Sequence, residues 1–176
     1  MKPPITIKDE EIKLHDGEFI VSKTDTTGRV TYANRVFMEI CGYSEEELLG
    51  VQHNIIRHPD MPRGVYRFLW STIETGQEFF GFVKNLCADG RYYWVFANVT
   101  PDYDINGEVI GYLSVRRKPS QKAIDTLGPI YKAMIDIENN SASKKTAPDE
   151  SIAFLVQQLE DMKIDYQSFV LGLFNE

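Results

Sequence analysis

Residues 52–62 have the sequence QHNIIRHPDMP, which brings two of the three histidines, an arginine and an aspartate into a segment with two prolines. Each proline fixes its own φ and disfavours helix in the residue before it, so this segment is stiff. Asp60 is then predicted to be the N-cap of a helix that opens at Pro62. A stiff loop that presents Arg57, His58 and Asp60 beside a helix N-terminus suits a polar or negatively charged ligand. The alternative is a surface loop whose charges face water.

The length and composition of the chain indicate one domain with an appendage. The chain has 176 residues, 43% of them hydrophobic, which is enough to bury a core without disulfides or metals. The formal charge of −7 and the pI near 5.0 argue against nucleic acid or an anionic membrane as a partner. Cys41 and Cys87 form no CxxC motif and no metal-ligand spacing, which indicates core residues in a reducing compartment. No apolar run is long enough to enter a membrane and the N-terminus lacks a signal peptide, so we expect a cytoplasmic protein.

The strand and helix signals predict an α+β fold. Two strands come first, over 18–25 and 29–33. Two short helices follow, one capped by Asn34 and one opened by the capping box of Ser44 and Glu47. The remaining elements are a helix over 63–75 and strands over 79–88, 92–101 and 108–118. This order is typical of a five-stranded antiparallel sheet with short helices on one face.

Side-chain alternation separates an inner from an outer face of the last strands. If Lys84 faces solvent, the odd-numbered residues from Phe79 to Cys87 face the helices. On the next strand, a connection with one extra residue would turn inward Tyr93, Val95, Ala97 and Val99, whereas a strict two-residue hairpin would turn Trp94 and Phe96 inward. We favour the first alternative, because its smaller inward residues leave volume for a ligand. It places on the outer face Phe80, Phe82, Trp94 and Phe96, and an exposed apolar face usually marks an interface.

Two more helical segments are expected in the C-terminal third. A helix over 120–138, interrupted at Gly128-Pro129, precedes a polar linker over 139–149. Over 150–176, apolar residues alternate at spacings of three and four, which predicts an amphipathic heptad helix. These residues are Ile152, Leu155, Leu159, Met162, Tyr166, Phe169 and Leu173. The alternative is a helix packed back on its own domain. The chain before residue 120 divides into an N-terminal arm (1–17) and the main domain (18–119).

Several motifs, in this order, resemble the PAS domain of bacterial aerotaxis (energy-taxis) receptors. The most specific are RHPDMP at 57–62, VKN at 83–85 and GY-x-S-x-R at 111–116. The other matching residues are Gly42-Tyr43-Ser44, Glu47-Leu48, His53-Asn54, Tyr93-Trp94-Val95, Ala97-Asn98, Pro129 and Tyr131-Lys132-Ala133. The resemblance covers residues 18–136 and implies a PAS fold, a non-covalently bound FAD and a sensor that reports redox or energy state to a chemotaxis transducer by protein contact. Because those receptors continue into a membrane anchor, the chain resembles either a fragment or a stand-alone PAS subunit of a bipartite system.

The resemblance also implies cofactor-binding roles for nine residues. Asn85 would bond the polar edge of a flavin ring, and Arg116 would place a cation where a reduced ring carries negative charge. Arg57, His58 and Asp60 would hold the ribityl or phosphate part and order the loop. The other four are His53, Asn54, Trp70 and Ser114. For Trp70, an aromatic wall of the site and simple core packing both remain open.

The alternatives to a flavin redox sensor are a light sensor, a haem sensor, a cofactor-free interaction module and an enzyme. Light-sensing PAS domains carry a reactive cysteine at a position that falls at His53 here, so we do not expect a cysteinyl adduct. A haem PAS with His53 or His58 as axial ligand is one alternative, and a cofactor-free interaction module is another. The sequence shows no nucleophile–base pair and no metal cluster, so we do not expect an enzyme. We expect signal output through the outer sheet face, and a homodimer that forms through this face or through the C-terminal heptad helix, which serves for dimerisation or docking.

Overall fold

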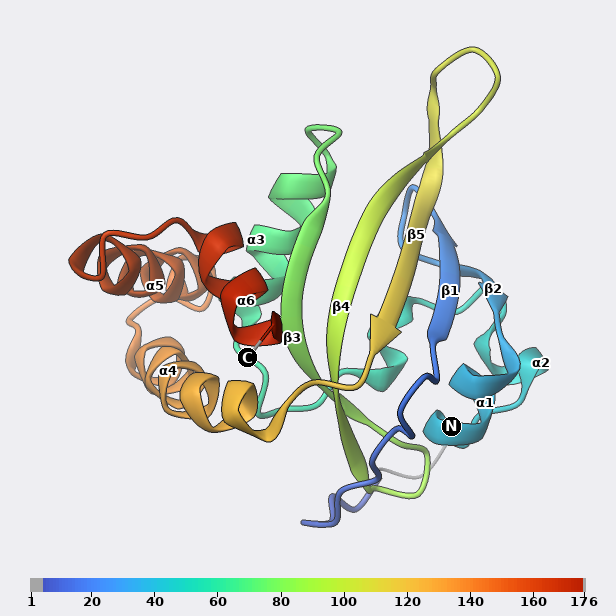
Figure 1. Cartoon of the computed structure of the whole chain (residues 1–176), viewed down its shortest axis with the longest axis horizontal. Helices are drawn as coiled ribbons and strands as arrows, with labels where there is room; N and C mark the ends of the chain where they lie inside the picture. The colour runs from blue at the N-terminus through green and yellow to red at the C-terminus, as the bar shows by residue number, and fades with distance from the viewer. Residues whose placement is uncertain (1–4, 176) are drawn as a thin grey trace.

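The computed structural model describes residues 5–175, and they form one antiparallel sheet packed with helices (Figure 1). The strands are β1 (Ile20–Asp25), β2 (Val30–Ala33), β3 (Phe79–Leu86), β4 (Tyr92–Tyr103) and β5 (Val109–Arg117). The helices are α1 (Arg35–Cys41), α2 (Glu45–Leu48), α3 (Arg63–Ile73), α4 (Gln121–Asn140), α5 (Ala147–Asp161) and α6 (Tyr166–Asn175), with a 3-10 turn at His53–Ile56. Figure 1 shows α1 and α2 at the β2 end of the sheet and α4 to α6 at the β3 end. The predicted α+β class is confirmed.

The sheet has the strand order β2-β1-β5-β4-β3. In the β3–β4 hairpin the amide of Cys87 donates to the carbonyl of Arg91 at 2.8 Å, which leaves three residues in the connection. Gly90, with φ of +92°, supplies the left-handed residue that such a connection requires. The register therefore turns Val83 and Ala97 to the same inner face, as the alternative with one extra residue predicts.

Local capping positions the helices that precede the site. The side chain of Asn34 accepts a hydrogen bond from the amide of Phe37, and Ser44 makes its capping box with Glu47. Both caps are confirmed. The predicted cap of α3 by Asp60 is wrong, because Asp60 forms an ion pair with Lys84 at 2.8 Å.

The N-terminus of α3 is capped by a residue from α4. Glu138, 8% exposed, accepts hydrogen bonds from the amides of Arg63 at 3.0 Å and Gly64 at 2.8 Å. Its carboxylate also accepts a hydrogen bond from the Ser151 hydroxyl of α5 at 2.7 Å. A negative charge at a helix N-terminus is favourable, so this one carboxylate joins three helices.

The C-terminal helices cover the outer face of β3 and β4, which we expected to be exposed. The hydroxyl of Tyr131 in α4 donates to the carbonyl of Phe82 at 2.8 Å. The Tyr131 ring stacks on Trp94, and the ring of Phe174 in α6 stacks on Phe96 at 4.3 Å. Phe82 and Phe96 are 0% and 4% exposed, and Phe80 and Trp94 are half-buried. The prediction of an exposed aromatic face is therefore wrong, because the chain supplies its own cover.

The expected shapes of the C-terminal segments also change. α4 continues through Pro129 without the predicted interruption. The single heptad helix expected over 150–176 is two helices, α5 and α6, joined by a turn at 162–165. Both helices pack on the rest of the chain, which is the alternative that the sequence left open.

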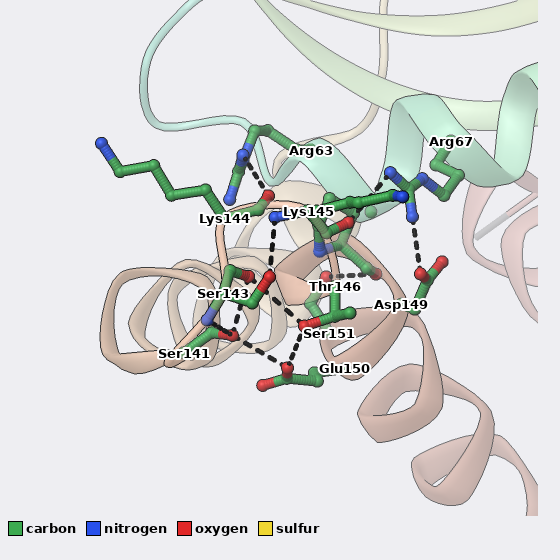
Figure 2. Close-up of polar contacts among 12 residues, drawn as sticks. Arg63, Arg67, Ser141, Ser143, Lys144, Lys145, Thr146, Asp149, Glu150 and Ser151 are labelled. Carbon is green, nitrogen blue, oxygen red and sulfur yellow. Dashed lines mark hydrogen bonds and ion pairs between the residues drawn. The ribbon is translucent and has the colours of Figure 1, made fainter.

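The polar segment that follows α4 is held against α3. Only residues 141–146 lie between α4 and α5. Arg63 donates to the carbonyl of Lys144 at 3.1 Å, and Arg67 donates to that of Lys145 at 3.3 Å (Figure 2). Arg67 also forms an ion pair with Asp149 at 2.6 Å. The polar composition suggested a flexible linker, but in the structure this segment is docked on α3 by two backbone carbonyls and by Asp149.

The N-terminal arm runs beside the start of β4. The amide of Lys8 donates to the carbonyl of Gly90 at 2.8 Å, and the amide of Ile12 donates to that of Tyr92 at 2.7 Å. Residues 1–4 of the predicted arm lie outside the described residues, as does residue 176 of the heptad segment. Within 5–175, no helix combines the length and apolar character needed to cross a bilayer.

Candidate functional site

A cavity of about 200 Å³ lies between the inner face of the sheet and α3. The sheet lines it with Thr24, Val83, Asn85, Ala97, Val99, Tyr112, Ser114 and Arg116. α3 lines it with Tyr66, Leu69, Trp70 and Ile73, and the preceding segments add Gly28, Gln52, His53, Asn54, Ile56 and Arg57. Seven of the nine residues predicted from the sequence thus meet at one cavity: His53, Asn54, Arg57, Trp70, Asn85, Ser114 and Arg116.

Arg116 places a buried positive charge on the cavity. The residue is 3% exposed, its Nη2 donates to Ser22 Oγ at 2.5 Å, and its guanidinium lies over the Phe37 ring at 4.4 Å. Its Nε and Nη1 atoms are buried without a hydrogen-bond partner among the described residues. Burial lowers the pKa of Arg116 to about 10, so the group remains a cation at neutral pH. Unpaired donors on a buried cation form a site for an electron-rich or anionic group.

His53 continues this polar chain. Its Nε2 lies 3.1 Å from Ser22 Oγ, and its ring stacks on Phe37 at 5.8 Å. Burial and the nearby charge of Arg116 lower the pKa of His53 to about 3. The imidazole is therefore neutral at pH 7, and its Nε2 can accept the hydroxyl hydrogen of Ser22.

Arg57 supplies a second cation. Its guanidinium lies 3.7 Å from the ring centre of Tyr66, and its Nε is buried without a partner in the described part of the chain. The backbone of Arg57 pairs with that of Asn85, which fixes the loop to the free edge of β3. No aspartate or glutamate lines the cavity among residues 5–175, so both cations act without a local counter-charge.

An aromatic wall closes one side. Trp70 packs edge-on against Tyr112 with ring centres 5.4 Å apart, and it borders the cavity while remaining half-buried. A Cβ at Gly28 would lie 3.0 Å from the Trp70 ring, and Gly28 has a φ of +83°. The turn between β1 and β2 therefore needs glycine for its conformation and for its approach to Trp70.

Polar residues of the sheet face the same space. Asn85 on β3 is buried at 4% exposure, and Ser114 on β5 lies opposite Ser22 in the strand register. Asn54 is exposed at the edge of the cavity. These amide and hydroxyl groups can donate and accept hydrogen bonds to a polar ring edge.

His58 and Asp60 are not brought to the cavity. His58 is 2% exposed, its Nδ1 accepts from the amide of Asp60 at 3.1 Å, and its ring packs edge-on against Tyr92. Burial and the charge of Lys84 lower the pKa of His58, so the ring is neutral and suited to accept this bond. The Asp60–Lys84 ion pair holds the same loop to β3. Both residues order the loop that carries Arg57.

The sequence reasoning missed Tyr66, Gln52 and Ser22. Tyr66 recurs with Leu69, Trp70 and Ile73 at helical spacing, so a second apolar face of α3 was the available signal. Gln52 lies within the quoted loop, and its side chain donates to the carbonyl of Thr27 at 3.1 Å. Ser22 carries no sequence signal, because its importance comes from Arg116, 94 residues away.

The two cysteines lie away from the cavity lining. Cys41 and Cys87 are buried free thiols, and burial raises the pKa of both, for Cys87 to about 12. Protonated, buried thiols are poor nucleophiles. Among the described residues no cluster of three or more His, Cys, Asp or Glu could hold a metal ion.

Residues 30–116 match a family model described as the PAS fold. The aerotaxis receptor of Escherichia coli K12 is 36% identical over 128 residues, which are 73% of this chain and 25% of the receptor. A nitrogen fixation regulatory protein of Klebsiella pneumoniae is 33% identical over 97 residues, which are 55% of this chain and 20% of that protein. This chain thus spans a quarter or less of the length of these relatives.

A solved light-oxygen-voltage domain, from a study of a flavin analogue, is similar in fold. Its TM-score is 0.52 at 24% identity, and the match covers 69% of this chain and 86% of the other. At this identity the likeness concerns the fold alone. Together with the sheet order and the cavity beneath α3, the family match identifies residues 30–116 as a PAS domain, in a chain that is similar over 128 residues to the E. coli aerotaxis receptor.

Proposed function

We propose that this chain binds FAD non-covalently in the cavity and reports redox or energy state to a chemotaxis-type transducer by protein contact. The observation that carries the proposal is the buried Arg116 guanidinium, whose Nε and Nη1 have no partner among the described residues. Burying a cation without a counter-charge costs several kcal/mol, so its retention is best explained by a ligand that pairs with it.

The shape and lining of the cavity suit a flat, partly polar ring. Val83, Ala97 and Val99 give an apolar floor on the sheet, and Leu69 and Trp70 of α3 lie opposite. The volume of about 200 Å³ is below the ~300–1,000 Å³ usual for whole-ligand pockets. The cavity would therefore hold the ring, and the phosphate-bearing remainder of FAD would lie outside it.

Different residues of the chain would contact different parts of the cofactor. A flavin supplies electron transfer when bound, and Asn85 would bond the polar edge of its ring. Arg116 would favour added negative charge on the ring, because a nearby cation stabilises an anion. Arg57 would add a second cation, and His58 would act through the loop rather than by contact.

The comparisons support this proposal at a coarser level. The E. coli relative is an aerotaxis receptor, which makes a taxis signalling role the natural one to propose here. The fold neighbour from a flavin-analogue study has the same architecture.

A haem site has less support. A haem iron would need a free imidazole nitrogen facing the cavity. The Nε2 of His53 is 3.1 Å from Ser22 Oγ, and His58 does not line the cavity. The cofactor-free module would leave the unpaired donors of Arg116 unexplained.

Signal output would use α3, which has two functional faces. Tyr66 and Trp70 face the cavity, whereas Gly64 packs on α5, where an added Cβ would lie 2.9 Å from the Pro148 carbonyl. A shift of α3 with ligand charge would therefore alter the docking of α5 and α6. Hydrogen exchange of residues 147–175, measured in oxidised and reduced protein, should differ if α3 transmits the state.

The direct test is the absorbance spectrum of the purified protein, followed by release of the cofactor and its mass. We expect the two absorption bands of an oxidised flavin and the mass of FAD. Arg57→Ala should lower affinity by about tenfold or more, since a charge-assisted hydrogen bond contributes roughly 1.5–3 kcal/mol. Arg35→Ala, which removes an exposed arginine paired with Glu39, is the matched control. A Soret band, or no band after reconstitution with FAD, would exclude the proposal.

A further inference from the structure

The heptad pattern of the C-terminal segment continues through the turn that separates α5 from α6. The spacing runs three, four, three, four, three, four from Ile152 to Leu173, and Met162 lies on it inside the turn. Residues 149–171 contain neither glycine nor proline. A pattern of this kind specifies one continuous helix as readily as it specifies a hairpin.

The turn itself holds a non-glycine residue in an unfavourable conformation. Lys163 has a φ of +55° and is the only described non-glycine residue with positive φ. The amide of Lys163 donates to the Glu160 carbonyl at 2.9 Å, and that of Ile164 donates to the Leu159 carbonyl at 3.1 Å. This is the Schellman termination, in which glycine is the usual residue at the position of Lys163. Lysine disfavours this conformation and favours a helix interior.

Asp165 opposes a continuous helix by opening α6. Its side chain accepts hydrogen bonds from the amide of Ser168 at 2.9 Å and from the Ser168 hydroxyl at 2.6 Å. Asp165 and Lys163 are both exposed, and neither lines the cavity. The two side chains thus bias the turn in opposite directions.

α6 packs on an apolar surface formed by the rest of the chain. Tyr166 packs edge-on against Phe68 at 4.8 Å and stacks near Phe79 at 5.8 Å. At the other end Phe174 stacks on Phe96 at 4.3 Å. Met162, in the turn, is 49% exposed. If the turn straightened, α6 would leave this apolar surface, and the same surface would be exposed on a second copy that had straightened its own turn.

We propose that the face of β3 and β4 beneath α6 is an interaction surface for a second copy of this chain, which exchanges α6 through a straightened turn at 162–165. Each exchanged α6 makes in the partner the contacts that it makes here within one chain, so the dimer differs from two monomers in the free energy of the turn and in the entropy of association. The heptad residues near the turn, which include the exposed Met162, then lie where the two connections pass each other. Exchange of an element through a hinge is a low-cost route to dimers.

Two surface variants shift the turn in opposite directions. Lys163→Gly relieves the positive φ and weakens the continuous helix, so we expect dimerisation to fall by at least about tenfold. Asp165→Ala removes the α6 cap and strengthens the continuous helix, so dimerisation should rise by about tenfold or more. Light scattering after size exclusion, over a range of protein concentrations, measures both. If both variants match the wild type, or if all three remain monomeric at every concentration, the exchange is excluded.

Cross-linking identifies the surface. Arg117 lies 5.6 Å from the Phe174 ring, and Asn175 follows Phe174 at an exposed position. The double variant Arg117→Cys and Asn175→Cys, in the Asp165→Ala background, is treated with a short thiol cross-linker, while the buried Cys41 and Cys87 remain protected. Exchange predicts covalent dimers from the dimer fraction and single linked chains from the monomer fraction. A dimer fraction that yields only linkage within single chains would show that another surface joins the copies.

Discussion

Replacing Glu138 by alanine should separate the C-terminal helices from α3. The carboxylate accepts four hydrogen bonds: from the Gly64 amide at 2.8 Å, from the Arg63 amide at 3.0 Å, from the Arg63 Nε at 3.3 Å and from the Ser151 hydroxyl at 2.7 Å. Three of these donors, the two amides and the hydroxyl, are held where α3, α4 and α5 meet. Alanine leaves the two amides without their acceptor, whereas the Ser151 hydroxyl can still donate to the Pro148 carbonyl at 3.0 Å.

The magnitude follows from the buried donors. An unsatisfied buried polar group costs about 1–3 kcal/mol, and water that enters the space recovers part of it. Two amides without an acceptor, together with the lost interaction between the carboxylate and the α3 N-terminus, give an expected loss of roughly 3–5 kcal/mol in the free energy of unfolding for Glu138→Ala. For a chain of this size each kcal/mol lowers Tm by about 2–4 °C, so Tm should fall by roughly 6–20 °C.

The assay is urea unfolding followed by circular dichroism and tryptophan fluorescence, together with hydrogen exchange of residues 147–175. Glu150→Gln is the matched control, because Glu150 is exposed and, within residues 5–175, accepts its hydrogen bonds from the Ser141 and Thr146 hydroxyls. We expect the control to stay within about 1 kcal/mol of the wild type. A Glu138→Ala protein that is as stable as the control, with unchanged exchange in α5 and α6, would show that the carboxylate does not join these helices.

Three further predictions concern α3 and the cavity. Gly64→Ala should destabilise the chain by about 1–3 kcal/mol in denaturant unfolding, because its Cβ would meet the Pro148 carbonyl at 2.9 Å. Arg116→Leu should lower the midpoint potential of bound flavin in a spectroelectrochemical titration, and an unchanged potential with flavin retained would place Arg116 away from the ring. Burial lowers the pKa of His53 to about 3, against about 6.5 in the unfolded chain. Between pH 6.5 and pH 3 the imidazole is therefore protonated in the unfolded state and neutral in the folded state. The free energy of unfolding should fall as the pH drops through this range. His53→Gln should weaken that pH dependence by up to about 1.4 kcal/mol per pH unit, and equal slopes in both proteins would refute the assignment.

The features that the sequence predicted correctly depend on neighbours in the chain. The cap at Asn34 and the box of Ser44 and Glu47 close bonds over three residues. The inward parity of Val83 and Ala97 follows from alternation and from one extra residue in the hairpin. Such features are determined by local backbone geometry, so the residues that form them are enough to predict them.

The features that were mispredicted depend on distant partners. Asp60 has the spacing of a cap for α3, yet the acceptor comes from Glu138, 75 residues beyond Arg63. Once Glu138 serves the amides, Asp60 is free to pair with Lys84. The same holds at the site, where His58 and Arg57 are adjacent in sequence but only Arg57 lines the cavity. Consecutive residues in an extended segment point to opposite sides, and the motif alone does not tell which side faces the ligand.

The heptad segment shows how one pattern supports two structures. An apolar stripe of alternating three and four spacing buries itself equally well against a second helix or against the aromatic face of a sheet. The sequence shows both the stripe and the face of Phe82 and Phe96. It predicts a partner outside the chain for the face, and for the stripe it leaves open a second chain or the helix's own domain. In the structure the C-terminal segment covers this face of its own chain, in part through Phe174, which follows the stripe residue Leu173 and stacks on Phe96. Two unpartnered apolar surfaces in one chain should therefore first be tested against each other, since a covalently linked partner has a high effective concentration. A second copy can compete only where the link between them can straighten, and in this chain that link is the turn at Lys163.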